Sequence, residues 1–131
     1  MATSAMPHVA IQEYLMSNRP NDGRKAFGDF APALAEYTDE VLFGDVWERP
    51  SLSKRDRSLI TVATPVALYR TNEPPFHLKR ALENGLSRDE LIEVITHLAF
   101  YAGWPSASTA INLARPIFEE SEGHFASSEP H

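Results

Sequence analysis

The sequence predicts an all-α fold, and three observations support that class. Apolar residues recur at helical spacing through most of the chain from about residue 30 to about residue 119. No segment alternates apolar and polar residues as strands with one buried face do. Glycine and proline lie where the helical pattern starts or stops. We therefore expect a compact domain of about five to six helices.

The length suits one domain with less regular segments at both ends. The chain has 131 residues, which is a common size for a single domain. Residues 1–25 mix Pro, Asn, Ser and Gly with a short apolar patch, and they predict a flexible N-terminal arm. Residues 121–131 predict a polar C-terminal tail. The helical domain is therefore expected over residues 26–120.

The first helix is expected over about residues 30–43. Its apolar residues recur at helical spacing and share one stripe: Phe30, Leu34, Tyr37 and Val41. Gly44 ends the helix, because glycine commonly terminates helices. The next segment, WERPSL, interrupts the pattern, since Pro50 pushes Arg49 towards an extended conformation.

The second helix is expected to begin at Ser53, which forms a capping-box pattern with Asp56. It runs towards Tyr69 through a largely apolar sequence. Pro65 lies inside it, and an interior proline removes a backbone hydrogen bond at a cost of ~3 kcal/mol unless the helix kinks. We therefore expect a bend between Thr61 and Pro65.

The third and fourth helices have clear boundaries in the sequence. Pro74 and Pro75 suit the first turn of the third helix, where a missing N–H costs nothing, and Gly85 ends that helix. Ser87, followed three residues later by a glutamate, forms a capping box for the fourth helix. Gly103 ends the fourth helix.

The last two helices indicate self-association. The fourth helix is apolar on more than half of its surface, and such a helix needs burial on several sides. Pro105 opens a fifth helix, whose small residues allow the close approach of another backbone: Ala107, Ser108, Ala110 and Ala114. Because five helices alone bury the fourth helix poorly, we expect a homo-oligomer.

Composition excludes several classes of function. The chain has 12 basic and 18 acidic residues, a formal net charge of −6 and no cluster of Lys and Arg, so no nucleic-acid partner is expected. No segment has the ~20 apolar residues of a membrane span, and the N-terminus lacks a secretory signal pattern, so we expect a cytoplasmic protein without a membrane partner. The absence of cysteine excludes disulfides, thiolate nucleophiles and Cys-ligated zinc.

Glu73 and His77 are the first candidates for chemistry. They are spaced i, i+4 at the expected start of the third helix, so their side chains lie near each other if this segment is helical. A carboxylate beside an imidazole raises the pKa of the ring and fixes its tautomer, which prepares a general acid or base. Glu73 also suits a structural role, since an acidic residue stabilises a helix N-terminus by its charge. The residues alone leave both interpretations open.

The fourth helix repeats this spacing in Glu93, His97 and Tyr101. A histidine among apolar neighbours is often a hydrogen-bonded packing residue, so packing and function both stay open for His97. No further ligand completes a metal set, and no metal site is predicted. Arginines near the ends of the second helix suit either carboxylate binding or a solvated face: Arg49, Arg55, Arg57 and Arg70.

Two segments, FGDVWERPSLSKRDRSLITVA and EPPFHLKRALENGLSRDELIEVITHLAFYAGWPSA, carry several motifs in order. These are Trp-x-Arg-Pro-x-Leu, His-x3-Ala-Leu-x2-Gly and Tyr-x-Gly-x-Pro. From about Phe43 to Glu119 the chain resembles the carboxymuconolactone decarboxylase family. The AhpD-like peroxidases of that family carry Cys-x2-Cys before the histidine, where this chain has Arg70 and Glu73. Cysteine-dependent peroxidase activity is therefore excluded.

The resemblance implies an AhpD-like helical fold in a ring-like homotrimer or homohexamer, with pockets near subunit contacts. It implies a lyase of the 4-carboxymuconolactone decarboxylase type, which needs no cofactor and acts on a small anionic lactone or related carbonyl compound. By the same resemblance, His77 is the proton donor or oxyanion partner, and Glu73 orients it and tunes its pKa. The implied substrate-binding residues are Arg49, Arg57, Arg70, His97, Tyr101 and Trp104.

A non-catalytic alternative stays open beside this interpretation. Pro65 and the Pro74–Pro75 pair depart from the pattern of the family, and they would reshape a pocket. The chain would then be a ligand-binding or assembly module on the same fold. Its polar residues would stabilise subunit contacts, where an exposed Glu/His pair contributes little.

Overall fold

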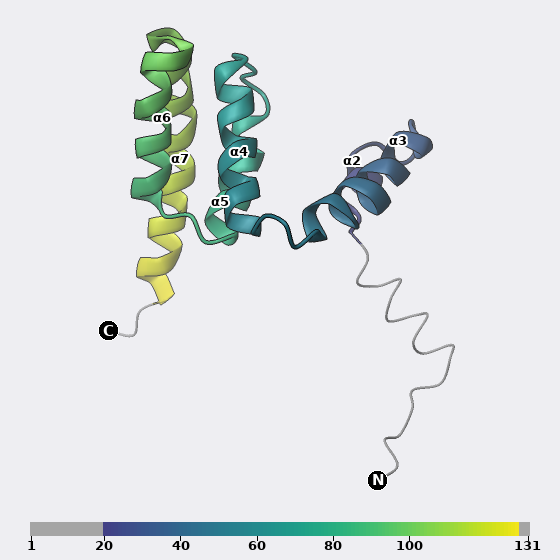
Figure 1. The fold of residues 1–131 in the computed structure, drawn as a ribbon. Helices are drawn as coiled ribbons and strands as arrows, with labels where there is room; N and C mark the ends of the chain where they lie inside the picture. Colours follow the sequence, from purple (N-terminus) through teal and green to yellow (C-terminus); the bar gives the residue numbers. More distant parts are fainter. Residues whose placement is uncertain (1–19, 129–131) are drawn as a thin grey trace. The chain divides into compact units, whose positions relative to one another are not determined.

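The fold is all-α in the part of the chain that the structure describes, as the sequence predicts. A computed structural model places residues 20–128, with side chains described up to residue 122. These residues form six α-helices, α2 to α7, with one π-helix, one 3₁₀-helix and no strand (Figure 1). Contacts divide the chain between Ser51 and Leu52 into two compact units. The boundary lies within residues 26–120, for which the sequence predicts one domain.

The first unit is built from short helices. These are α2 (Asp22–Phe27), α3 (Pro32–Glu36), the π-helix η1 (Tyr37–Phe43) and the 3₁₀-helix η2 (Val46–Glu48). α2 begins inside the arm expected over residues 1–25, of which residues 1–19 lie outside the described part of the chain. The single helix expected over residues 30–43 is instead an α-helix that becomes a π-helix at Tyr37.

A buried carboxylate joins the elements of the first unit. Asp39 accepts hydrogen bonds from the backbone N–H groups of Gly23 at 2.7 Å and Arg24 at 3.0 Å. These N–H groups belong to the first turn of α2, where no intrahelical acceptor exists, and a negative charge there is stabilising. Gly23 is required at this contact, because an added Cβ would lie 2.7 Å from Thr38 Cβ. The elements of this unit therefore meet through Asp39 and a glycine.

This contact explains why the predicted apolar stripe is not the buried face. Ala35 and Asp39 are buried, whereas Phe30, Leu34 and Tyr37 are exposed in the described chain. The segment of α3 and η1 has its apolar residues on one face. The hydrogen bonds of Asp39 turn a different face of this segment towards α2. The predicted stripe is therefore largely exposed in the described chain, and the buried positions of this segment are Ala35 and Asp39 instead.

The second unit contains four longer helices. They are α4 (Lys54–Ala67), α5 (Pro74–Glu83), α6 (Arg88–Ala102) and α7 (Trp104–Ser128). α4 packs on α5 and α6, and α7 packs on α5 and α6, so each helix has two principal neighbours (Figure 1). Their shared core consists of side chains that lie far apart in the sequence: Val62, Val66, Leu78, Ala81, Leu86, Leu91, Ile95, Ala99, Ala107, Ala110, Ala114, Ile117 and Phe118.

The predicted starts of α4, α5 and α6 and the predicted ends of α5 and α6 are confirmed. The Ser53 hydroxyl accepts a hydrogen bond from the Asp56 N–H at 3.0 Å. Ser87 and Glu90 form both bonds of a capping box, at 3.1 Å and 3.0 Å. Gly85 ends the third predicted helix with φ 102°, which glycine adopts more readily than residues with a Cβ. The start and end signals in the sequence therefore fix α4, α5 and α6 closely.

α4 ends near its predicted position, whereas α7 runs further than the sequence pattern suggests. α4 continues through Pro65 to Ala67, and the bend expected near this proline stays a prediction. α7 continues to Ser128 and so includes most of the expected polar tail. An ion pair between Arg88 and Glu122 joins this extension to α6. Within residues 20–128, no helix combines the length and apolarity of a membrane span.

Candidate active site

The turn between α4 and α5 brings the first candidate residues together. The Arg70 N–H donates to the Pro65 carbonyl at 2.8 Å, and the Tyr69 N–H donates to the Val66 carbonyl at 3.2 Å. These two bonds are the Schellman arrangement that reverses a chain at a helix C-terminus. Tyr69 takes the left-handed conformation that this arrangement requires, with φ 57°. The chain then enters α5 within a few residues.

Arg70, Glu73 and His77 lie together at the start of α5. Arg70 Nη1 is 3.6 Å from Glu73 Oε1, and both side chains are partly exposed. The backbone N–H of His77 donates to the backbone carbonyl of Glu73 at 3.4 Å, and this bond places both residues on the first helical turn. Pro74 and Pro75 occupy the first positions of the helix, as predicted. The structure therefore gathers a guanidinium, a carboxylate and an imidazole within one short segment.

The side chain of Glu73 does not cap the helix. Glu73 occupies the N-cap position but makes no side-chain hydrogen bond to the first-turn N–H groups. Its carboxylate meets Arg70 instead. Glu73 can therefore stabilise the start of α5 only through its negative charge. Its carboxylate stays partly exposed beside His77.

His77 has a lowered pKa. Burial disfavours the charged imidazolium and lowers the pKa of His77 below its ordinary value of 6.5, while the charge of Glu73 raises it and offsets part of that effect. The spacing of Glu73 and His77 predicts a raised pKa for His77. This prediction is wrong for the net shift, because burial lowers the pKa by more than the charge of Glu73 raises it. At neutral pH, His77 is therefore mostly a neutral ring that has both a donor and an acceptor nitrogen.

Replacing Glu73 by glutamine is expected to lower the pKa of His77 further. The substitution removes the negative charge that raises this pKa and leaves the effect of burial in place. An NMR titration of the His77 ring measures the shift. Glu83→Gln is the matched control, since this exposed carboxylate lies at the far end of the same helix. An unchanged or higher His77 pKa in Glu73→Gln contradicts the assignment of this charge contact.

An aromatic residue that the sequence analysis did not single out borders His77. The Phe76 ring meets the His77 ring edge-on, with centroids 5.3 Å apart. Arg80 Cζ lies over the Phe76 ring, 5.4 Å from its centroid. Among described residues the His77 ring makes no hydrogen bond. The imidazole is therefore held by packing, and its nitrogens can bind a ligand.

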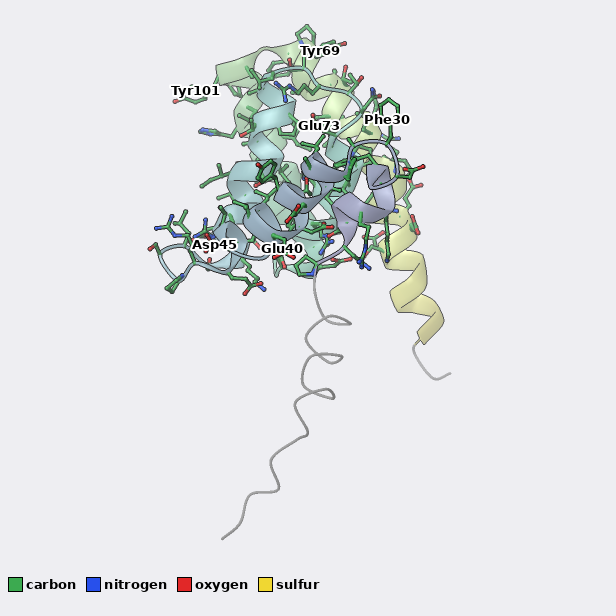
Figure 2. All side chains as sticks on the ribbon, turned by 90° about the vertical axis from the view of Figure 1, so that its right-hand side faces the viewer. Phe30, Glu40, Asp45, Tyr69, Glu73 and Tyr101 are labelled. Carbon is green, nitrogen blue, oxygen red and sulfur yellow. The ribbon has the colours of Figure 1, made fainter. Side chains whose placement is uncertain are left out.

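His97, Tyr101 and Trp104 belong to two aromatic pairs at the end of α6 and the start of α7. The rings of His97 and Tyr101 stack with centroids 4.8 Å apart, and Trp104 meets Phe100 edge-on at 5.7 Å. The Tyr101 side chain points away from the helix and is exposed to solvent (Figure 2). In the described part of the chain, no hydrogen bond, ion pair or ring contact links these pairs to Arg70, Glu73 or His77. One chain thus presents the predicted site residues in more than one group.

His97 also borders an apolar groove between α4 and α6. The groove has a volume of about 490 Å³. An ion pair between Arg55 and Glu90 lies beside its apolar walls. Its lining residues are Arg55, Leu59, Ala63, Leu86, Glu90, Glu93, Val94, His97 and Leu98. His77 is not among them, so this groove and the Glu73/His77 pair are distinct features of the second unit.

Two further predicted carboxylate-binding residues are Arg57 and Arg49. Arg57 is half-buried on α4. Arg49 belongs to the first unit, where it follows the 3₁₀-helix η2. Of the three predicted arginines, the described contacts bring Arg70 alone to the Glu73/His77 pair. Among the side chains that the structure describes, residues 20–122, no three His, Cys, Asp or Glu are grouped so as to hold a metal ion.

Comparison with known proteins identifies related sequences. The profile of the carboxymuconolactone decarboxylase family matches residues 32–116. The 4-carboxymuconolactone decarboxylase of Acinetobacter baylyi is 34% identical over 108 residues, which cover 82% of this chain and 81% of that protein. The nitrosuccinic acid decarboxylase of Metarhizium robertsii is 34% identical over 85 residues, which cover 65% of this chain and 59% of that protein. The family match includes both Glu73 and His77.

Proposed function

Because this chain belongs to the carboxymuconolactone decarboxylase family, we propose that it is a carboxy-lyase that needs no cofactor and acts on a small anionic lactone or related carbonyl compound. The observation that carries the proposal is the convergence of Arg70, Glu73 and His77 on the first turn of α5. A cation, a carboxylate and a half-buried imidazole are the groups that such a reaction requires.

The chemistry explains why these groups suffice. In a γ-carboxy-γ-lactone with a ring double bond, the bond to the carboxylate breaks and CO₂ leaves. The electron pair passes through the double bond into the lactone carbonyl and forms a dienolate. One proton from solvent then adds to carbon and gives the enol-lactone. The substrate itself accepts the electrons, so the protein must hold the anion, stabilise the developing oxyanion and transfer a proton.

His77 is proposed as the acid/base residue, with Glu73 as its partner. Its lowered pKa favours the neutral imidazole at neutral pH, and the N–H of a neutral ring can donate a hydrogen bond to the developing oxyanion. The negative charge of Glu73 stabilises the protonated ring when His77 passes a proton to the dienolate. Arg70 is proposed to hold a substrate carboxylate, because guanidinium groups match carboxylate geometry.

The names of the two decarboxylases indicate what their substrates share. Carboxymuconolactone carries a lactone carbonyl, and nitrosuccinic acid carries a nitro group. Each of these groups can accept the electrons that a departing carboxylate leaves behind. We therefore propose that the substrate of this chain is a small carboxylic acid with such an acceptor built into it. A protein that supplies only charge stabilisation and a proton donor can act on either kind.

Turnover of 4-carboxymuconolactone tests the proposed function. The purified full-length chain is mixed with this lactone, and released CO₂ and loss of substrate are both measured. Release of one CO₂ for each lactone consumed, without an added cofactor, supports the proposal. A folded chain that binds the lactone but releases no CO₂ contradicts decarboxylation of this lactone and supports the non-catalytic binding module.

Self-association is part of the proposal, as a homotrimer or homohexamer. Three large aromatic side chains are exposed where α6 meets α7: Phe100 at 76%, Tyr101 at 79% and Trp104 at 64%. Exposed apolar surface of this kind is typical of interaction sites. Contact with a neighbouring copy would cover these rings and add walls to the site.

Phe100→Glu is expected to reduce the size of the assembly, because a carboxylate buried at a subunit contact is destabilising. Light scattering coupled to size-exclusion chromatography measures the molar mass. Thr96→Glu is the matched control, since it adds the same charge at an exposed position one turn earlier on α6. A wild-type monomer, or an assembly that is unchanged in Phe100→Glu, contradicts this interface.

A further inference from the structure

Tyr69 is the one residue other than glycine that has a positive φ within the described chain. Its φ of 57° brings Cβ close to the backbone, so this conformation is unfavourable for a tyrosine. Glycine adopts it without that cost and is the usual residue at this position of a Schellman turn. Strained residues of this kind persist where surrounding structure holds them, and they concentrate at functional sites. The question is what the tyrosine side chain contributes here.

Packing within one chain does not explain the tyrosine. The residue is 56% exposed, and its side chain lies at the edge of the second unit (Figure 2). Its hydroxyl accepts one hydrogen bond, from Thr109 Oγ1 of α7 at 3.4 Å, near the outer limit for such a bond. An exposed, long hydrogen bond offsets little of the backbone strain. The stability of the chain therefore gives no reason for a tyrosine at this position.

The surroundings of the phenol point to a ligand. Tyr69 lines a small hollow of about 10 Å³ together with Arg70 and Thr71 and with residues of α7, and this volume suits a single oxygen of a ligand. Because the Tyr69 hydroxyl accepts the hydrogen bond from Thr109, its own O–H group is still available as a donor. This O–H group has no acceptor among the described residues. Arg70 is the next residue in the chain and contacts Glu73. A free O–H donor thus adjoins the arginine of the candidate active site.

We propose that Tyr69 is a substrate-contacting residue, whose phenol donates a hydrogen bond to a carboxylate or carbonyl oxygen that Arg70 also attracts. The proposal rests on the proposed function, since it assigns Tyr69 to the same site. The backbone turn then has two roles. It reverses the chain from α4 to α5, and it places Tyr69 on the hollow that Arg70 also lines.

Two substitutions separate the phenol from the backbone. Tyr69→Phe keeps the ring and the strain but removes the hydroxyl, and Tyr69→Gly removes both the ring and the strain. The probe is a saturated γ-carboxy-γ-lactone, which has no ring double bond to accept electrons and is therefore not decarboxylated. Calorimetry gives its dissociation constant for the full-length chain, and thermal unfolding gives stability. Thr109→Val is the control, since it removes the hydroxyl that donates to Tyr69.

Tyr69→Phe is expected to weaken lactone binding by about tenfold to a hundredfold, as for loss of a hydrogen bond to a charged group. With a substrate that turns over, KM should rise by more than kcat falls. Tyr69→Gly is expected to bind equally weakly and to unfold no earlier than wild type, and Thr109→Val is expected to bind almost normally. Wild-type affinity in Tyr69→Phe, or a lower unfolding temperature in Tyr69→Gly, overturns the proposal.

The outcomes for Tyr69 and for the proposed function are distinguishable. A wild-type chain that binds the saturated lactone but decarboxylates nothing contradicts the proposed function, while the Tyr69 variants still decide on the phenol. A chain that decarboxylates normally with Tyr69→Phe contradicts the role of Tyr69 and supports the proposed function. A wild-type chain that neither binds nor turns over such lactones overturns both.

Discussion

His77→Ala is expected to reduce decarboxylation by about 10²- to 10⁴-fold, the range for loss of a general acid or base. The substitution removes the imidazole from the first turn of α5 and leaves Arg70 and Glu73 in place. Because the His77 ring is half-buried and makes no hydrogen bond within the described chain, and because alanine keeps the backbone N–H, helix content should change little. The measurement is CO₂ release from 4-carboxymuconolactone at saturating substrate, with circular dichroism to check the fold.

Two control variants show whether the loss of turnover is specific to His77. Lys79→Ala removes a neighbouring exposed side chain on α5 and should keep wild-type turnover. His97→Ala removes the histidine that follows Glu93 with the same i, i+4 spacing, but it stacks on Tyr101 at the surface. If His97→Ala loses most of its turnover and His77→Ala loses none, His97 with Glu93 is the acid/base pair instead. Normal turnover in both variants would rule out histidine acid/base catalysis.

The pH profile separates the two roles of His77. If the neutral ring stabilises the oxyanion, turnover falls as the pH drops through the lowered His77 pKa and the ring becomes charged. If the imidazolium delivers the proton, turnover falls as the pH rises through the same pKa. In either case, Glu73→Gln should move this limb to lower pH, because it removes the charge that raises the pKa.

Local rules predicted the helices of the second unit well. Hydroxyl side chains at Ser53 and Ser87 begin α4 and α6, and glycine at 85 and 103 follows the ends of α5 and α6. These signals act over one helical turn, so they can be recognised in the chain without knowledge of the tertiary fold. The i, i+4 spacing predicted that Glu73 and His77 lie close together at the start of α5, while the roles that the resemblance implies for them stay predictions.

Features set by distant contacts could not be predicted in the same way. Asp39 caps α2 across more than a dozen residues, so the buried face of its own helix does not follow the apolar pattern. The lowered pKa of His77 depends on burial by neighbouring helices, which the spacing from Glu73 does not reveal. Tyr69 gives no sequence signal, since a left-handed turn is normally marked by glycine.

Leu78→Ala is expected to reduce the free energy of unfolding by about 2–5 kcal/mol, the usual range for truncating a buried leucine. Leu78 is fully buried in the shared core of the second unit, and it follows His77 directly on α5. The loss combines reduced burial of apolar surface with a cavity that the neighbouring helices fill only partly. Since domains are stable by only about 5–15 kcal/mol, this one change removes a large share of stability.

Urea denaturation measures this loss, with all variants at one protein concentration because self-association stabilises the folded state. Leu68→Ala is the matched control, since it is the same truncation at a largely exposed leucine after α4, and it should cost less than ~1 kcal/mol. Leu78→Ala should also slow turnover in folded protein, because a loosened α5 no longer holds His77 beside Glu73. Equal losses of stability in the two variants would contradict the position of Leu78 in the core.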